Sequence, residues 1–386
     1  MYMKFVVACD SFKGCMTSKE VGQTIEKGIL KANFQHRVKV FSMADGGEGT
    51  AQAFCDVING KMVDVNTLDA YHRKIRAGIC LSQEEDIAII DVASCIGLSM
   101  VDKKDRNPMI TSSKGVGILI KQALSFGVSK IIIGLGGSST NDGGMGLLSE
   151  FGVRFYDSNR ELLRPNTYAL GKIAFIDKRA FSIPSNVEFI VACDVKNHLL
   201  GQEGATYIFG KQKGIYENQM EEIDSWLRHY RDKLDQTFHV DVNEFEASGA
   251  AGGIGAVLLG MFHARMVPGI QLLTEYAHLE DEISKCDIVI TGEGQTDRQT
   301  VYGKVPYGIA QLAKKYDKPV ICLSGALGLG YEELYKEGVI GIFSSADRAM
   351  SFQTALKTAS AKLEALAFSV VRLIEGVIKY EENKLK

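Results

Sequence analysis

The chain has 386 residues, which is long for one domain and favours two. Its 44 basic and 47 acidic side chains give a net charge of −3, so the sequence lacks the basic footprint of a nucleic-acid-binding protein. The N-terminus lacks the apolar core of a secretory signal, and no apolar stretch reaches the length that crosses a bilayer. We therefore expect a cytoplasmic protein with no nucleic-acid or membrane partner.

The start of the chain predicts alternating strands and helices. A strand is expected over Lys4–Cys9. Thr17 and Glu20 fit a capping box, in which each side chain bonds the backbone amide of the other residue, and apolar residues then recur at helical spacing. A second strand over Arg37–Met43 and a second helix over Gly47–Ile58 follow.

The middle of the chain predicts a different arrangement. We expect strands over Lys61–Val65, Ala77–Cys80, Ala88–Val92, Lys130–Leu135 and Glu188–Val191. Helices are expected over Ser113–Phe126, Glu217–Gln236 and Gly252–His263. We interpret this region as an inserted α/β domain.

The end of the chain returns to the first pattern. Asp287–Thr291 is a continuous apolar strand of the kind found in buried parallel sheets. A helix, two strands and a long helix follow, over Val305–Tyr316, Val320–Leu323, Gly338–Phe343 and Leu356–Ile378. Together the two ends predict an α/β fold with a doubly wound parallel sheet. Residues 1–60 plus 284–386 would form this discontinuous domain, and residues 61–283 would form the inserted one.

Candidate chemistry lies in clusters of glycine, carboxylates and lysine. The common fingerprints GxxxxGK[ST] and GxGxxG are absent, and so are HExxH and GxSxG. Instead, many of the 40 glycines gather in six clusters, and glycine exceeds its usual share of the chain. No histidine or cysteine has an obvious partner for nucleophilic catalysis. This inventory is typical of phosphoryl transfer, in which positioning and charge neutralisation do the catalysis.

Two clusters follow the first two strands, where ligands of open α/β sheets bind. In Asp10–Gly14, Lys13 can neutralise a phosphate or a carboxylate, although a surface turn explains the same residues. In Ala44–Thr50, Asp45 and Glu48 flank glycines whose amides suit a magnesium phosphate site. The alternative is a helix start with Asp45 as its N-cap.

Two further clusters are richest in glycine. Gly134–Gly144 adds hydroxyl groups ahead of a helix, which favours an anion cradle over a purely structural turn, and its Asp142 can hold a cation. Ser248–Gly255 contains small residues that let the backbone approach either a ligand or another segment closely. The sequence leaves these two alternatives for Ser248–Gly255 open.

The last two clusters combine carboxylates with lysines. Asp194 and Asn197 suit a metal or a substrate hydroxyl, and lysines in Phe209–Gly214 suit phosphate, but an Asx-turn and solvated lysines explain them equally. After the apolar strand near the C-terminal end, Glu293 and Asp297 can coordinate Mg²⁺ and Lys304 can bind phosphate. A loop that starts a helix is the alternative there.

The motifs DSFKG, MADGGEGT, GLGGSSTNDGG, ACDVKN with FGKQKG, SGAAGGIG and TGEGQTDRQT occur in this order. In this arrangement the chain resembles the bacterial glycerate kinases of the first type, from about Lys4 to Gly328. The resemblance implies a flavodoxin-like domain with a second α/β domain inserted, and an active site in the cleft between them. It also implies phosphorylation of D-glycerate by ATP with Mg²⁺, most often giving 2-phosphoglycerate.

The motifs and the resemblance together imply a set of site residues. The expected catalytic residues are Lys13, Asp194, Lys213 and Lys304. ATP is expected at Gly136, Gly137, Ser138, Ser139, Asn141, Gly252, Gly253, Gly292 and Gly294. Substrate is expected at Asp10, Ser11, Asn197 and Asp297, and metal at Asp45, Glu48, Asp142 and Glu293. Asp194 is the first candidate for the base, but the sequence leaves open which carboxylate is base and which bind metal.

Other functions stay open at this point. The product could be 3-phosphoglycerate, or the acceptor another small hydroxy acid. A non-catalytic sugar-acid binding protein is a further alternative, supported by His198, Gln202 and Lys211 standing where the family often has proline. We expect a monomer or a homodimer.

Overall fold

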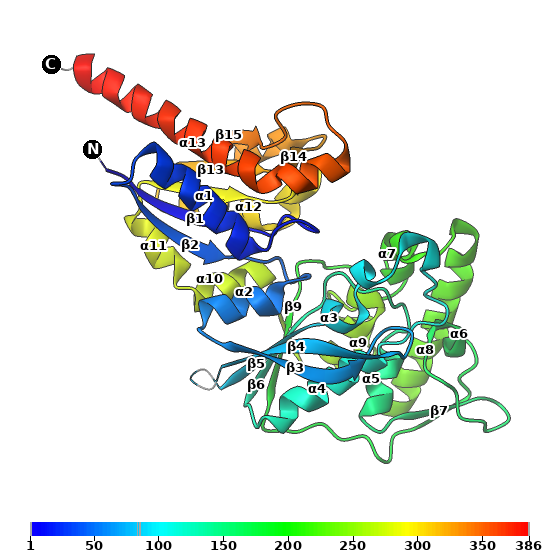
Figure 1. The fold of residues 1–386 in the computed structure, drawn as a ribbon. Helices are drawn as coiled ribbons and strands as arrows, with labels where there is room; N and C mark the ends of the chain where they lie inside the picture. Colours follow the sequence, from blue (N-terminus) through cyan, green and yellow to red (C-terminus); the bar gives the residue numbers. More distant parts are fainter. Residues whose placement is uncertain (1, 83, 85, 385–386) are drawn as a thin grey trace. The chain divides into compact units, whose positions relative to one another are not determined.

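The computed structural model describes residues 2–82, 84 and 86–384 (Figure 1). Unit 1 comprises Met1–Asp45 and Ile270–Lys386, and unit 2 comprises Gly46–Gly269, so unit 2 is inserted into unit 1. The sequence placed these crossings near residues 60 and 284. Two helices explain why the boundaries differ from the predicted ones. The helix after residue 46 packs on strands of unit 2, and the helix before residue 286 packs on unit 1.

Unit 1 is built on a five-stranded sheet. Its strand order is β15-β13-β11-β1-β2, and every pair is parallel. Numbered within the unit, this is the 2-1-3-4-5 order of flavodoxin-like folds, which confirms the predicted doubly wound sheet. The order reverses beside β1, so the switch point lies between β1 and β11. The strands are β1 (Lys4–Cys9), β2 (Arg37–Ser42), β11 (Ile288–Gly292), β13 (Val320–Ser324) and β15 (Val339–Ser344).

Helices cover the sheet of unit 1. Helices α1 and α13 pack against each other over the side chains of Phe5, Val7 and Cys9, while α11 and α12 contact the strands β1 and β11. Thr17 and Glu20 form the predicted capping box at the start of α1. The helices are α1 (Ser18–Ala32), α10 (Gly269–Tyr276), α11 (Leu279–Lys285), α12 (Val305–Lys314) and α13 (Phe352–Lys384); two-residue strands β12 (Gln295–Thr296) and β14 (Ala326–Leu327) lie in its loops.

Unit 2 is built on a six-stranded mixed sheet in the order β10-β9-β6-β5-β4-β3. Strands β5, β6, β9 and β10 are parallel, whereas β3, β4 and β5 pair antiparallel. The short strand β10 was not predicted, nor was the antiparallel pair of β7 and β8. The strands are β3 (Lys61–Leu68), β4 (Lys74–Ser82), β5 (Ile87–Asp91), β6 (Lys130–Gly134), β7 (Arg154–Tyr156), β8 (Phe175–Asp177), β9 (Glu188–Ala192) and β10 (Arg265–Val267).

One apolar core joins the sheet of unit 2 to its helices α4, α5, α8 and α9. Helix α7 lies where the sequence predicted a lysine-bearing motif rather than a helix. The helices are α2 (Thr50–Val57), α3 (Ala93–Ile96), α4 (Lys114–Ser125), α5 (Met145–Glu150), α6 (Thr167–Leu170), α7 (Ala205–Lys213), α8 (Met220–Phe238) and α9 (Ile254–Gly260). Across the described residues, no helix has the length and apolar content that a membrane crossing requires.

Candidate active site

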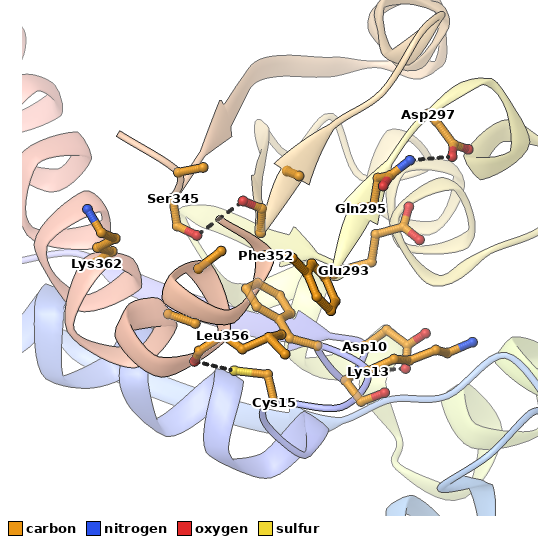
Figure 2. Close-up of a pocket in the computed structure, with 18 of the residues that line it drawn as sticks. Asp10, Lys13, Cys15, Glu293, Gln295, Asp297, Ser345, Phe352, Leu356 and Lys362 are labelled. Carbon is orange, nitrogen blue, oxygen red and sulfur yellow. Dashed lines mark hydrogen bonds between the residues drawn. The ribbon is translucent and has the colours of Figure 1, made fainter. Parts of the chain in front are cut away.

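A cavity of about 390 Å³ opens at the switch point of unit 1 (Figure 2). Strands β1 and β11 end together there, because Cys9 pairs with Gly292 and the amide of Asp10 donates to the Gly292 carbonyl at 2.8 Å. Ligands of doubly wound sheets bind beyond the carboxyl ends of strands at this kind of position. The charged residues that line the cavity are Asp10, Lys13, Asp45, Glu293, Asp297, Lys304 and Lys362.

Asp10 is the most buried of the aspartates that line this cavity, with 5% of its surface exposed. Burial, together with the nearby carboxylates of Asp45 and Glu293, raises its pKa to about 7 against the opposing effect of Lys13 and the Ser11 amide. The Ser11 amide donates to the Asp10 carboxylate at 2.7 Å. A carboxylate with this pKa is suited to take up and release a proton at neutral pH.

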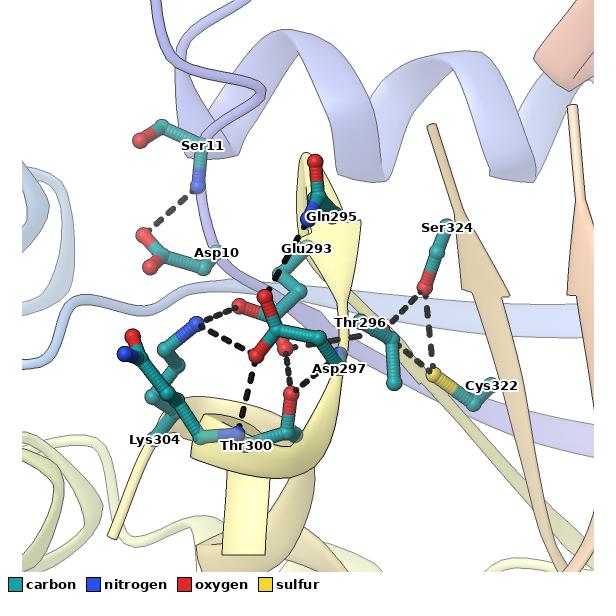
Figure 3. A network of polar contacts seen from close by, with 11 residues as sticks. Asp10, Ser11, Glu293, Gln295, Thr296, Asp297, Thr300, Lys304, Cys322 and Ser324 are labelled. Atoms are coloured by element: carbon teal, nitrogen blue, oxygen red, sulfur yellow. Dashed lines mark hydrogen bonds and ion pairs between the residues drawn. The ribbon is translucent and has the colours of Figure 1, made fainter. Parts of the chain in front are cut away.

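A polar network holds Glu293 in place (Figure 3). The Thr300 hydroxyl donates to its carboxylate at 2.6 Å, and the Lys304 ammonium donates at 3.2 Å. Burial raises the pKa of Glu293, and Lys304 opposes that shift. Asp297 also lies 3.9 Å from the Lys304 ammonium, and its side chain caps the short helical turn Arg298–Tyr302 by accepting from the Gln299 amide.

These contacts show that the predicted residues of unit 1 have different structural positions. Lys304 forms an ion pair with Glu293, which suits a residue that positions that carboxylate. Ser11 and Gly294 line the cavity, whereas Gly292 ends β11 with a backbone so close to Leu323 that an added Cβ would lie 1.9 Å from its carbonyl oxygen. Gly292 therefore serves close packing of the strands.

In unit 2, Lys213 is buried under the glycine-rich loop that follows β6. Only 2% of its surface is exposed, and its ammonium donates to the Thr140 carbonyl at 2.7 Å and to the Ser138 hydroxyl at 3.3 Å. Burial lowers the pKa of Lys213 to about 7, and Asp142 opposes this shift. The structure thus brings together three predicted residues: Ser138, Asp142 and Lys213.

Asp142 organises this loop. Its carboxylate is fully buried and accepts from the amide and hydroxyl of Ser113 at 2.8 and 2.9 Å, and from the amides of Gly144 and Gly146. Burial raises the pKa of Asp142, although these donors oppose the shift. Because chain donors already surround the carboxylate, the geometry favours a structural role over metal binding. Ser139 is similar, since its amide and hydroxyl both donate to the Ile96 carbonyl.

Close backbone approach explains several of the predicted glycines. A Cβ on Gly252 would lie 2.1 Å from the Thr140 carbonyl oxygen, and one on Gly136 would lie 2.4 Å from the Gly47 Cα. Gly137, Gly252 and Gly253 have positive φ, which suits glycine. The segment containing Gly252 and Gly253 therefore packs on the loop after β6, which is the packing alternative that the sequence left open.

Asn141 contributes a buried amide to this loop. Its amide nitrogen donates to the Thr206 hydroxyl at 3.1 Å, and among the described residues its carbonyl oxygen has no hydrogen-bond partner. Asn197 holds its own loop by donating to the Glu203 carbonyl. Asp194 accepts from the Gly269 amide at 3.2 Å, and Glu48 is exposed and accepts from Ser99 at 3.0 Å.

Among the described residues, no three or more histidine, cysteine, aspartate or glutamate side chains lie together so that they could hold a metal ion. Mg²⁺ is commonly held by one or two carboxylates, water and substrate phosphates. The carboxylates that face the cavity of unit 1 fit that kind of site, because their mutual repulsion favours a cation.

The pattern of the glycerate kinase family matches residues 5–375. The chain belongs to the glycerate kinase family. The glycerate kinase of Halalkalibacterium halodurans is 38% identical over 366 residues, which cover 95% of this chain and 96% of that protein. The glycerate 2-kinase of Escherichia coli (strain K12) is 39% identical over 344 residues, or 89% and 90% of the two chains.

A solved structure agrees with the fold of this kinase. The crystal structure of a Salmonella typhimurium LT2 protein assigned as glycerate kinase 2 is 36% identical, covers 98% of this chain and 100% of that chain, and has a TM-score of 0.84. The chain is thus a kinase, and its family implies ATP as the co-substrate.

Sequence reasoning missed two features of the kinase. Asp91, at the end of β5, is buried and accepts from the amides of Gly49 and Ala51 at 3.1 and 2.9 Å, so it caps α2 in place of the suggested Asp45. A lone aspartate 40 residues away from the helix gave no local signal of this contact. The second feature is an apolar wall of the unit 1 cavity, which comes from the start of α13.

Proposed function

We propose that this kinase transfers the γ-phosphoryl group of ATP to the 2-hydroxyl of D-glycerate, giving 2-phospho-D-glycerate, with Mg²⁺ as the metal. The observation that carries the proposal is the convergence of Asp10, Lys13 and Glu293 on one cavity at the switch point of unit 1. The glycerate 2-kinase name of the Escherichia coli relative supports the choice of hydroxyl.

The proposed metal ligands are Asp45 and Glu293. Both line the cavity, and after burial their carboxylates are the groups that raise the pKa of Asp10 beside them. When bound, Mg²⁺ would neutralise phosphate charge during transfer. Lys304 and Thr300 position the Glu293 carboxylate through their hydrogen bonds.

Asp10 is the proposed base. It orients the glycerate hydroxyl and accepts its proton. With a pKa of about 7, a large fraction of Asp10 is ionised at neutral pH, and the ionised carboxylate is basic enough to accept a proton. Lys13 offsets the charge of the substrate carboxylate or the transferring group. A single active site shared by both units, to which Lys213 of unit 2 would contribute, stays a prediction from the sequence.

The test is ³¹P NMR of the purified protein with ATP, Mg²⁺ and D-glycerate. We expect a new phosphomonoester signal that is split by one proton, since the 2-phosphate sits on a CH group. Splitting by two protons would identify the 3-phosphate and contradict the choice of hydroxyl. Intact ATP with D-glycerate, but turnover with another hydroxy acid, would move the proposal to that acceptor.

A protein that binds D-glycerate and ATP and transfers nothing would be the non-catalytic alternative. That outcome would contradict the proposed function as a whole. Light scattering of the same sample distinguishes the expected monomer and homodimer.

A further inference from the structure

The cavity of unit 1 has two different ends (Figure 2). One end carries Asp10, Lys13, Asp45, Glu293, Asp297 and Lys304. The other end is mainly apolar, with Lys362 of α13 as its charged residue. Its apolar residues come mainly from the segment before α13 and its first turns: Phe12, Met350, Phe352, Ala355, Leu356 and Ala359. D-glycerate bears oxygen on every carbon, so it offers no apolar surface to such a wall.

The size of the cavity also exceeds what D-glycerate needs. A cavity of about 390 Å³ lies in the range of sites that bury ligands of drug or cofactor size, roughly 300–1,000 Å³. The charged end alone accounts for a small acid and a phosphoryl group. The apolar end can therefore bind a part of a substrate other than the acid and the phosphoryl group.

Helix α13 builds the apolar end as one continuous face. Phe352, Leu356 and Ala359 recur at helical spacing, so they lie on the same side of the helix. Phe352 borders the cavity and leaves 75% of its surface exposed, so its ring is accessible to a ligand. The alanines Ala355 and Ala359 leave space beside the larger side chains.

An ion pair and a backbone hydrogen bond hold this wall. Lys362, which lines the cavity from α13, pairs with Asp347 of the preceding loop. The amide of Ser345 donates to the Ser324 carbonyl at 2.8 Å, which ties this loop to the end of β13. These contacts hold the loop and the helix, and with them the apolar face, in position.

We propose that the apolar end binds the adenine base of ATP, with Phe352 and Leu356 against the base and the phosphates directed to the Lys13 and Glu293 end. Aromatic and aliphatic side chains suit a purine ring, because they cover its faces without competing for its polar edge. Ser345 lines the same cavity and supplies a hydroxyl for that edge. This inference rests on the proposed function for its co-substrate.

The test compares a probe with a base and a probe without one, by calorimetry with Mg²⁺. Phe352→Ala should weaken binding of a non-hydrolysable ATP analogue about tenfold, the usual loss of one stacking contact, and leave inorganic tripolyphosphate binding unchanged. Ala355→Trp should block the analogue by filling the apolar end, and again spare tripolyphosphate. Phe34→Ala is the matched control, since Phe34 is 84% exposed and lies outside the cavity.

Unchanged analogue affinity in both variants would overturn the inference, and so would equal losses for the analogue and tripolyphosphate. A rise in the KM of D-glycerate alone would place the acid at the apolar end and also overturn it. Failure of the wild type to phosphorylate D-glycerate, with analogue binding still lost in Phe352→Ala, would reject the proposed function and keep this inference. A thermal melt of each variant checks folding.

Discussion

At the scale of single residues, burial of the Lys213 ammonium lowers the stability of this kinase. Its ammonium is buried, and its pKa falls from 10.5 to about 7. The unfolded lysine keeps its proton up to about pH 10, whereas the folded lysine loses it above about pH 7. Between these values the unfolded state binds more protons, so the wild-type free energy of unfolding rises with pH across this window.

We therefore expect Lys213→Met to be more stable than the wild type at pH 7, by about 2–4 kcal/mol after allowance for the lost hydrogen bonds. The advantage should shrink as the pH rises to 9.5, while kinase activity is lost at both values. Urea unfolding at the two pH values measures the effect. A variant that is less stable at pH 7 would show that the ammonium stabilises the loop after β6.

Asp10 carries the second prediction at this scale. Asp10→Asn keeps the size of the side chain and an acceptor for the Ser11 amide, but it cannot take up a proton from the hydroxyl. We expect kcat to fall about 10²–10⁴-fold, the usual contribution of a general base, with a small change in the KM of D-glycerate. A coupled kinase assay measures both constants.

Asp64→Asn is the control for Asp10→Asn, since Asp64 is an exposed surface aspartate of unit 2. Near-normal kcat in Asp10→Asn would remove Asp10 as the base. Asp194→Asn would then be the next variant, because Asp194 was the first candidate from the sequence.

At the scale of elements, two glycines differ in both backbone conformation and surroundings. Gly252 has φ +67°, and a Cβ there would lie 2.1 Å from a carbonyl oxygen of the loop after β6. Gly376 lies inside α13 and has nothing within 4 Å of the added Cβ. Gly252→Ala should destabilise the protein by more than about 2 kcal/mol, through strain and displacement of that loop.

Gly376→Ala should instead stabilise the protein by about 0.5–1 kcal/mol, because alanine loses less backbone entropy in a helix. Urea unfolding gives both values. Equal effects of the two substitutions would show that the segment with Gly252 moves away from the loop at little cost.

At the scale of the whole molecule, unit 2 is one continuous stretch with its own core. Trp226, the single tryptophan of the chain, lies in α8 and stacks edge-on with Tyr168 at 5.7 Å. We expect a fragment of residues 46–269 to fold alone and unfold cooperatively. Its tryptophan fluorescence should follow the same urea transition as circular dichroism. A red-shifted emission in buffer would show that unit 2 needs the rest of the chain.

Much of this architecture was predictable because its signals are local. The strand Lys4–Cys9 has the predicted bounds, the capping box at Thr17 is present, and α12 begins at the predicted Val305. Buried parallel strands are apolar throughout, so the sequence alone marks them. The three-residue strand β10 carries too few residues for such a pattern.

Features that depend on distant contacts were not predictable. The burial of Lys213 depends on Thr140 and Ser138, some 70 residues earlier in the chain. The two lysines of α7 resembled a solvated pair, because their spacing says nothing about which one is covered. The unit boundary near residue 46 depends on α2 packing against β4 and β5, which no local pattern records.

The insertion also sets the order in which the protein can assemble during synthesis. Strand β1 pairs with β11, and Ile288 leaves the ribosome 246 residues after Ser42 ends β2. At about 5–20 residues per second, the first two strands wait roughly 12–50 s for β11, the next strand of their sheet. All of unit 2 is synthesised during that wait. The nascent chain then contains a complete inserted domain and an unpaired apolar edge of β1, which chaperones can bind.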